Sequence, residues 1–184
     1  MTAATREGGE PTDGELIARW RAGDERAATL LVERHAGALA RYAASLGVRE
    51  DLDELVQDTF VRAFASLDRF RGESALRTWL FTIERRLLLD RRRARRRGRE
   101  EVAIEGADAA SEYDALDSLV AGETERKVRA AVARLSPTQR EVFTLRVGEG
   151  LSYKEIAEVA GTTEGAARVH YHNAMRAVKE FLDD

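Results

Sequence analysis

Apolar residues recur at spacings of three and four along most of the chain, which is the pattern of helices with one buried face. Two such helices are predicted within residues 14–46, on either side of a break at Gly23 and Asp24. The strongest pattern runs from Asp51 to Phe70, and its apolar positions are Leu52, Leu55, Val56, Phe60, Ala63, Phe64 and Leu67. Patterns typical of strands are scarce. We therefore expect an all-α fold.

The second half of the chain repeats the helical pattern with clearer start signals. After Ser74, a good N-cap, a helix is predicted from about Ala75 into a run of arginines. Residues 123–184 predict four more helices, and two of these begin with the residues of a capping box, Ser136-Pro137-Thr138-Gln139 and Ser152-Tyr153-Lys154-Glu155. The last two helices are separated by Gly161-Thr162-Thr163, which predicts a helix-turn-helix.

The final helix has two distinct faces. At ~100° per residue, one stripe would pack on Ile156, Ala157 and Val159 of the preceding helix, and it consists of Ala167, Tyr171, Ala174 and Val178. The opposite stripe consists of Gly165, Arg168, His172, Met175, Arg176 and Lys179. Thr162 or Thr163 can cap this helix and offer a hydroxyl to DNA.

Charge divides the chain into the same parts as the helical pattern. Residues 13–97 carry 18 Lys/Arg against 14 Asp/Glu, whereas residues 98–125 carry 1 against 9. We therefore predict a disordered tail (1–12), a first small helical domain (13–97), an acidic flexible linker (98–122) and a second small helical domain (123–184). Two mildly basic blocks around an acidic linker suggest that the blocks contact nucleic acid.

Six of the seven residues from Arg91 to Arg97 are arginines. A solvated helix end would also carry basic residues, because they oppose the helix dipole. Six guanidinium groups exceed what that role requires, so the charge density favours contact with phosphates.

Several kinds of chemistry are disfavoured by the residues. There is no cysteine, so thiolate metal sites and disulfides are excluded. His170 and His172 lie two apart on a helix and point in different directions, so we expect no metal site and no cofactor. No phosphate-binding glycine loop or catalytic triad is present, and an enzyme is the least favoured class. No apolar run reaches the ~20 residues of a membrane span and no signal peptide is recognised, so we expect a cytoplasmic protein without membrane insertion.

Two long segments resemble one protein family. DLDELVQDTFVRAFASLDRFRGESALRTWLFTIERRLLLDRRR (residues 51–93) resembles region 2 of the extracytoplasmic-function group of sigma-70-type bacterial sigma factors. LSPTQREVFTLRVGEGLSYKEIAEVAGTTEGAARVHYHNAMRAVKEFL (residues 135–182) resembles their region 4. The resemblance implies that the protein binds core RNA polymerase through the β′ clamp helices and the β flap, directs it to promoter DNA and helps to melt the duplex. It also implies an anti-sigma factor as a partner.

The resemblance assigns roles to residues of the first domain. The polymerase-binding residues would be Asp53, Glu54, Gln57 and Asp58, which also form a polar helix face. The loop from Asp68 to Ser74 would capture a flipped base of the −10 element, and Phe70 would offer a ring for stacking. Phe70 is equally compatible with a place in the hydrophobic core, whereas Trp79 and Phe81 are expected to pack in the core. The residues implied for the −10 element and melting are Arg69, Phe70, Arg71, Gly72, Glu73, Ser74, Arg77, Arg85, Arg86, Arg91 and Arg92.

The resemblance also assigns the final helix to the −35 element. The residues implied are Thr162, Thr163, Glu164, Gly165, Arg168, His172, Arg176 and Lys179. The sequence departs from the family here, because G-A-A-R-V-H-Y-H-N-A-M replaces a pattern such as G-T-V-K-S-R-L-H-R-A-R. His170, Asn173 and Met175 stand at basic positions, so we expect weak DNA binding by this module alone.

Two other classes of protein remain as alternatives. A sigma-factor mimic would bind an anti-sigma factor without binding promoters, but such mimics usually carry a receiver domain and should lack the arginine run. A stand-alone helix-turn-helix repressor would leave residues 51–93 without a role.

Overall fold

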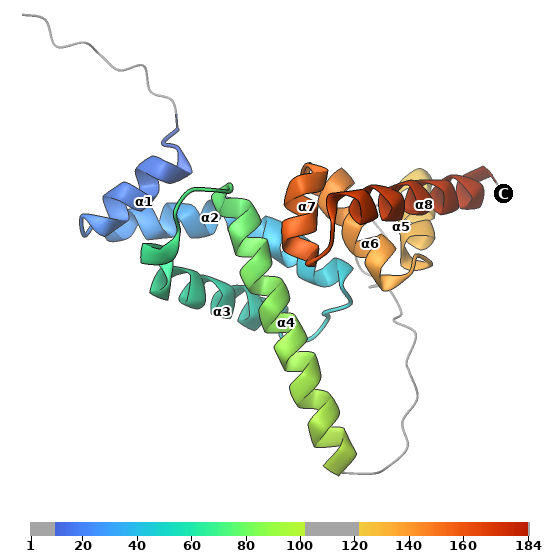
Figure 1. The fold of residues 1–184 in the computed structure, drawn as a ribbon, viewed down its shortest axis with the longest axis horizontal. Coiled ribbons are helices and arrows are strands. Elements are labelled where there is room, and N and C mark those ends of the chain that lie inside the picture. The colour runs from blue at the N-terminus through green and yellow to red at the C-terminus, as the bar shows by residue number, and fades with distance from the viewer. Residues whose placement is uncertain (1–9, 102–121, 184) are drawn as a thin grey trace, which may run out of the picture. The chain divides into compact units, whose positions relative to one another are not determined.

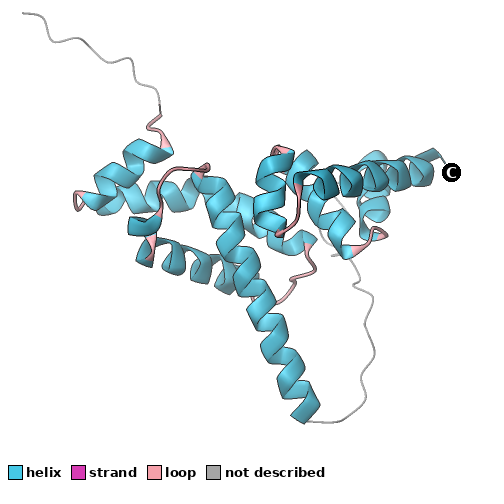
Figure 2. Cartoon of the chain, in the orientation of Figure 1, coloured by secondary structure: helices cyan, strands magenta, loops and turns pink. Residues whose placement is uncertain are grey.

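The computed structural model describes residues 10–101 and 122–183, and every regular element in these two ranges is a helix (Figures 1 and 2). The predicted all-α class is therefore confirmed. The described residues form two compact units, which divide between Gly37 and Ala38. The long helix α2 (Glu25–Ser45) begins in the first unit and continues into the second.

The first unit contains α1 (Asp13–Arg21) and the beginning of α2. Thr12 is the N-cap of α1 and forms a capping box with Glu15. On α2, Arg34 contacts one carboxyl oxygen of Asp13 at 2.7 Å and His35 contacts the other at 2.9 Å. Thr12, the last residue of the predicted tail, thus stabilises the start of α1. Residues 1–9 of that tail lie outside the described residues.

The helix predicted from Asp51 to Phe70 is shorter than its apolar pattern. It forms α3 (Leu52–Ala65), followed by a 3-10 turn, η1 (Leu67–Arg69). At Ser66 the backbone leaves the helical region, with φ −115° and ψ 11°, and the hydroxyl donates to the carbonyl of Arg62 at 2.6 Å. Leu67 is buried all the same, because the 3-10 turn carries it inward.

Helix α4 (Leu76–Glu101) contains the whole arginine run and continues past Gly98. The first four residues of the predicted linker are therefore helical, and residues 102–121 lie outside the described range. Helices α3 and α4 lie side by side (Figure 1). They share a hydrophobic core with the end of α2, formed by Ala43, Leu55, Leu87 and Leu88, with Leu46, Val48, Leu52 and Ile83 around it.

The predicted four helices of the C-terminal part are present: α5 (Glu123–Ala133), α6 (Pro137–Phe143), α7 (Tyr153–Ala160) and α8 (Glu164–Asp183). A π-helical turn, η3 (Thr144–Gly148), follows α6 directly. Both predicted capping boxes, at Ser136 and Ser152, are formed. The helices enclose a second core of Ala131, Leu135, Phe143, Ala174 and Val178.

The turn between α7 and α8 follows the predicted helix-turn-helix. Gly161 ends α7 in the left-handed conformation, with φ 63° and ψ 41°. The hydroxyl of Thr163 accepts a hydrogen bond from the amide of Ala166 at 3.1 Å, so Thr163 is the residue that caps α8. A glycine is favoured at Gly161 because a β-carbon raises the energy of this conformation.

We predict that Gly161→Ala lowers the free energy of unfolding by ~1 kcal/mol, because alanine is strained at positive φ. Gly165→Ala is the matched control: Gly165 lies in α8 with a negative φ and with open space around the position of a β-carbon. That change should stabilise the protein by ~0.5–1 kcal/mol. Urea denaturation followed by circular dichroism measures both effects, and an equal response of the two variants would contradict the prediction.

Candidate polymerase and nucleic-acid interfaces

The polar face of α3 carries the four residues implied for polymerase binding. Asp53, Glu54 and Gln57 are exposed and Asp58 is half-buried, while Leu55, Val56 and Phe60 are buried on the opposite side. Arg91 on α4 donates to Asp58 at 2.6 Å and to Glu54 at 3.2 Å. A residue implied for DNA therefore pairs with two residues implied for polymerase.

The loop between α3 and α4 presents mostly exposed polar groups. Arg69, Arg71 and Glu73 are exposed, and Gly72 has a φ of 72°, in the left-handed region. Phe70 is half-buried and lies against Trp79, with 5.1 Å between ring centroids. The ring is thus held in place by Trp79 and is not sealed in a hydrophobic core. Phe81 is completely buried, in agreement with its predicted packing role.

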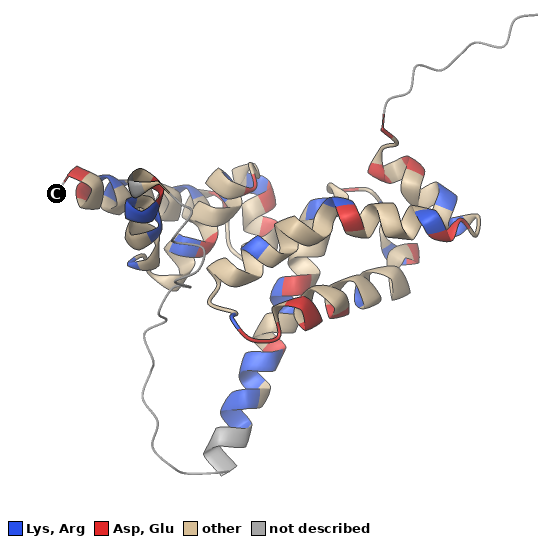
Figure 3. Ribbon diagram, turned by 180° about the vertical axis from the view of Figure 1, so that it is seen from behind, with Lys and Arg blue, Asp and Glu red and all other residues tan. Residues whose placement is uncertain are grey.

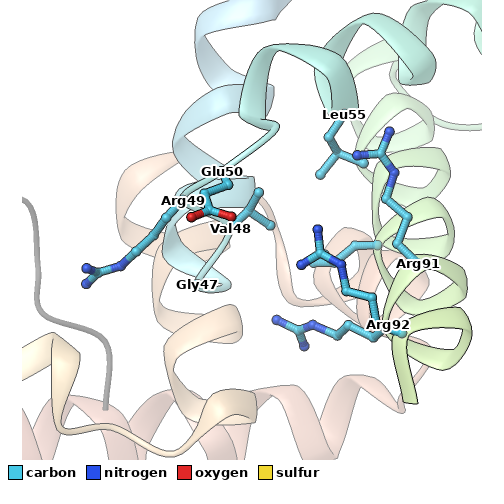
Figure 4. Close-up of a pocket in the computed structure, with 9 residues that line it drawn as sticks. Gly47, Val48, Arg49, Glu50, Leu55, Arg91 and Arg92 are labelled. Atoms are coloured by element: carbon cyan, nitrogen blue, oxygen red, sulfur yellow. The ribbon is translucent and has the colours of Figure 1, made fainter. Parts of the chain in front are cut away.

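The arginine run, residues 91–97, makes the second half of α4 strongly basic (Figure 3). Next to it lies a pocket of about 280 Å³ between α4 and the turn from Gly47 to Glu50 (Figure 4). Leu55 and Leu88 supply apolar lining, and Arg91, Arg92 and Arg95 line it from α4. Arg92 also donates to the carbonyl of Leu46. Guanidinium groups outnumber carboxylates here, so the surface favours anionic groups such as phosphates.

Arg77, which was implied for DNA contact, is engaged by a carboxylate from the C-terminal part. Glu149, just after η3, accepts from Arg77 and also from Nε of Arg41, at 3.1 Å. The side chain of Glu149 is only 1% exposed. A carboxylate removed from water in this way requires cationic partners, because an unpaired buried charge costs several kcal/mol.

A second buried contact involves Arg85, also implied for DNA. Glu141 on α6 accepts from Nε of Arg85 at 2.7 Å and from the hydroxyl of Tyr42 at 2.7 Å. Nearby, Thr78 donates to Glu155 on α7 at 3.1 Å. Three carboxylates of the C-terminal part thus bind side chains of α2 and α4. Sequence reasoning missed all three contacts, since Glu141, Glu149 and Glu155 fall in ordinary polar positions.

Burial changes the ionisation of two groups close to these contacts. Glu84 on α4 is 1% exposed, and among the described residues neither of its carboxyl oxygens has a hydrogen-bond partner. Loss of hydration raises the pKa of Glu84 from 4.5 to about 9, so the carboxyl is neutral at pH 7. Burial, followed by the negative charge of Glu141, raises the pKa of Tyr42 well above its usual value.

The exposed face of α8 contains the side chains implied for the −35 element. Arg168, His172, Arg176 and Lys179 are exposed, while Ala167, Ala174 and Val178 are buried as predicted. Arg168 pairs with Glu164 at 3.1 Å, and its guanidinium lies 5.1 Å from the ring centroid of Tyr153 on α7.

Thr163, Glu164 and Gly165 at the start of α8 are exposed, whereas Thr162 is half-buried. Sequence reasoning missed Val169, which is 59% exposed. The signal was available: Val169 lies opposite the buried stripe at ~100° per residue.

None of the helices within residues 10–101 and 122–183 combines the length and the apolar character needed to cross a bilayer. No group of three or more His, Asp or Glu side chains there is arranged to hold a metal ion.

Comparison with known proteins finds two family matches in the expected order. Residues 31–98 match the model of sigma-70 region 2, and residues 125–178 match the model of sigma-70 region 4. The first match covers most of α2, all of α3 and α4 up to residue 98, and the second runs from α5 into α8. The pair defines the class of protein: a transcription initiation factor of the sigma-70 type.

Individual relatives show to which group of sigma-70 factors the chain belongs. The ECF RNA polymerase sigma-E factor of Haemophilus influenzae is 33% identical over 181 residues, which cover 91% of this chain and 94% of that protein. The chain belongs to the ECF sigma factors of the sigma-70 family, and it directs RNA polymerase to promoters. The resemblance of residues 51–93 and 135–182 is thereby confirmed.

Solved structures agree with this assignment. The sigma factor RpoE of Bartonella quintana, in complex with the anti-sigma factor NepR, has a TM-score of 0.70 and 27% identity, covering 84% of this chain and 96% of that one. CnrH in complex with the cytosolic domain of CnrY has a TM-score of 0.66 and 31% identity, covering 93% and 97%.

We predict that Glu84→Gln stabilises the protein at neutral and alkaline pH. Between pH ~4.5 and about 9, Glu84 is protonated in the folded protein and ionised in the unfolded chain. Unfolding then releases a proton, so this residue lowers stability as pH rises through that range. Glutamine keeps the neutral shape at every pH, and its advantage over the wild type should grow from pH 5 to pH 8.

Urea unfolding curves at several pH values give this difference. Glu33→Gln, at an exposed position of α2, is the control and should not change the pH slope. A Glu84→Gln advantage that is the same at pH 5 and pH 8 would show that Glu84 is ionised in the folded protein.

Proposed function

We propose that three surfaces of this sigma factor carry its function. The polar face of α3, formed by Asp53, Glu54, Gln57 and Asp58, binds core polymerase. The loop from Arg69 to Ser74 and the basic side of α4 contact and help to melt the −10 element. The exposed face of α8 binds the −35 element. The observation that carries the proposal is the placement of the four α3 side chains on one accessible polar face, opposite buried Leu55 and Val56.

The proposed DNA-binding surfaces of α4 and α8 differ in charge, which supports different contributions to DNA binding. The arginine run on α4 supplies a dense array of cations for phosphates, and most of its side chains are exposed. On α8 the cations are few, and Arg168 is already paired with Glu164. In the proposal α4 therefore provides most of the electrostatic affinity, and α8 adds discrimination among upstream sequences once polymerase holds the DNA.

Two arginines of the −10 surface require a change of partner before they can contact DNA. Arg77 is bound to Glu149 and Arg85 to Glu141 in this conformation. A phosphate can replace a carboxylate as the guanidinium partner, because both accept paired hydrogen bonds. We propose that these ion pairs open when the protein engages polymerase and promoter, which separates the region 4 carboxylates from α4.

The proposal extends to a partner and a location. Since RpoE of Bartonella quintana forms a complex with the anti-sigma factor NepR, we propose that this chain also has an anti-sigma partner. Its site of action would be the cytoplasm, where polymerase meets the chromosome. It would act by binding alone, without a catalytic residue or a cofactor of its own.

The polymerase-binding face predicts a charge-reversal effect. Asp53→Arg combined with Glu54→Arg should weaken binding to core polymerase tenfold or more, because like charges at an interface cost several kcal/mol. A titration of labelled protein with core polymerase measures the affinity, and circular dichroism checks the fold. Glu33→Arg, at an exposed position of α2 outside this face, is the matched control. If the double variant and the control bind equally, the polymerase interface lies elsewhere.

The buried ion pairs predict a gain of DNA binding. Glu141→Gln with Glu149→Gln removes both negative charges that hold Arg85 and Arg77. The free protein should then bind a single-stranded −10 fragment several-fold more tightly than the wild type does, because two guanidinium groups become available for phosphates. Glu158→Gln, at an exposed position of α7, is the control. Unchanged affinity of a folded double variant would exclude Arg77 and Arg85 from the DNA surface.

A further inference from the structure

Val169 occupies the middle of the exposed face of α8. The buried stripe of this helix is formed by Ala167, Ala174 and Val178, at 0%, 0% and 6% exposure. At ~100° per residue, the direction opposite to that stripe passes through Val169. The side chain of Val169 is 59% exposed, the highest value among the large exposed apolar residues of α8. An isopropyl group is therefore displayed where a reading helix presents its side chains to DNA.

No neighbouring side chain on α8 covers Val169. Arg168 is drawn to one side by its pair with Glu164 and by the ring of Tyr153 on α7. Gly165, one turn earlier on the same face, has no side chain. His172 and Arg176 follow one and two turns later. The exposed face of α8 therefore has Val169 at its centre, with Arg168 to one side and His172 and Arg176 towards the C-terminus.

An isopropyl group restricts what can be recognised. It neither donates nor accepts a hydrogen bond, so it cannot distinguish the amino, carbonyl or ring-nitrogen groups of base edges. In the major groove, the base feature that matches an apolar side chain is the 5-methyl group of thymine. Contact between the two removes apolar surface of both from water, and the gain is that of burying about one methyl group.

We propose that Val169 selects thymine at a position of the upstream promoter element by packing against the thymine 5-methyl group. This inference rests on the proposed binding of α8 to that element. It explains how a helix with few free cations discriminates among sequences: the contact adds selectivity without adding charge.

The test removes the methyl group alone. An upstream element is first selected from a randomised promoter library by transcription with core polymerase and the full-length protein. Each thymine of the selected element is then replaced singly by uracil, which differs only in lacking the methyl group. For the wild type, one or two replacements should reduce open-complex formation about three- to fivefold. On the unmodified element, Val169→Ser should form open complexes about as poorly as the wild type does on the uracil-substituted element. Uracil at those positions should cause no further loss for this variant.

The matched control is Val147→Ala. Val147 lies on η3, in the same part of the chain, and is 54% exposed. Its variant should keep the wild-type sensitivity to uracil. The library selection gives a second readout, because Val169→Ser should relax the preference for thymine at the same positions while the rest of the element stays selected.

The outcomes separate this inference from the function on which it rests. If scrambling the entire upstream element has no effect, α8 does not read DNA and the proposed function of that helix fails. If scrambling matters but uracil is tolerated at every position, the thymine contact is wrong. If uracil reduces activity equally for the wild type and Val169→Ser, another residue contacts the methyl group. If Val169→Ser changes only the binding of a protein partner, Val169 belongs to a protein interface.

Discussion

Two carboxylates with almost no access to water determine how the C-terminal helices meet α2 and α4. Glu149 is paired with Arg41 and Arg77, and Glu141 with Arg85 and the hydroxyl of Tyr42. A desolvated carboxylate is tolerated only with such partners, so each contact also fixes the arginine that makes it. The placement of α6 and α7 against α4 and the occupancy of Arg77 and Arg85 therefore have the same physical cause. A neutral Glu84 completes this polar layer, because burial without a partner keeps its proton in place.

Charge also distinguishes the two surfaces that we propose to bind DNA. Most arginines of the run on α4 point to solvent, and long-range attraction to phosphates follows from their number. On α8 the charge is sparse, and the centre of the exposed face is an isopropyl group. Surfaces of this kind add little affinity by themselves. Their contribution depends on a polymerase that already holds the promoter, which is the setting in which a sigma factor acts.

Local signals in the sequence predicted most elements but not their limits. The capping boxes at Ser136 and Ser152 are formed as predicted, because the interacting groups are only three residues apart. The predicted end of α3 was wrong by several residues. Phe64 and Leu67 keep helical spacing, yet the backbone leaves the helical region at Ser66, where the hydroxyl and the amide both donate to the carbonyl of Arg62. Gly98 was expected to end α4, but one glycine costs a helix only ~1 kcal/mol, and α4 continues to Glu101.

The sequence by itself determined the helical class, the helix-turn-helix, the basic end of α4 and the sigma-70 resemblance, since all of these depend on residues that are near one another in the chain. Only the tertiary structure decided which charged side chains lose contact with water. Glu84, Glu141 and Glu149 look in sequence like any exposed glutamate. Glu141 meets Arg85 across 56 residues and Glu149 meets Arg41 across 108. Hydration is set by whatever packs across a side chain, and that neighbour is unknown until the chain is folded.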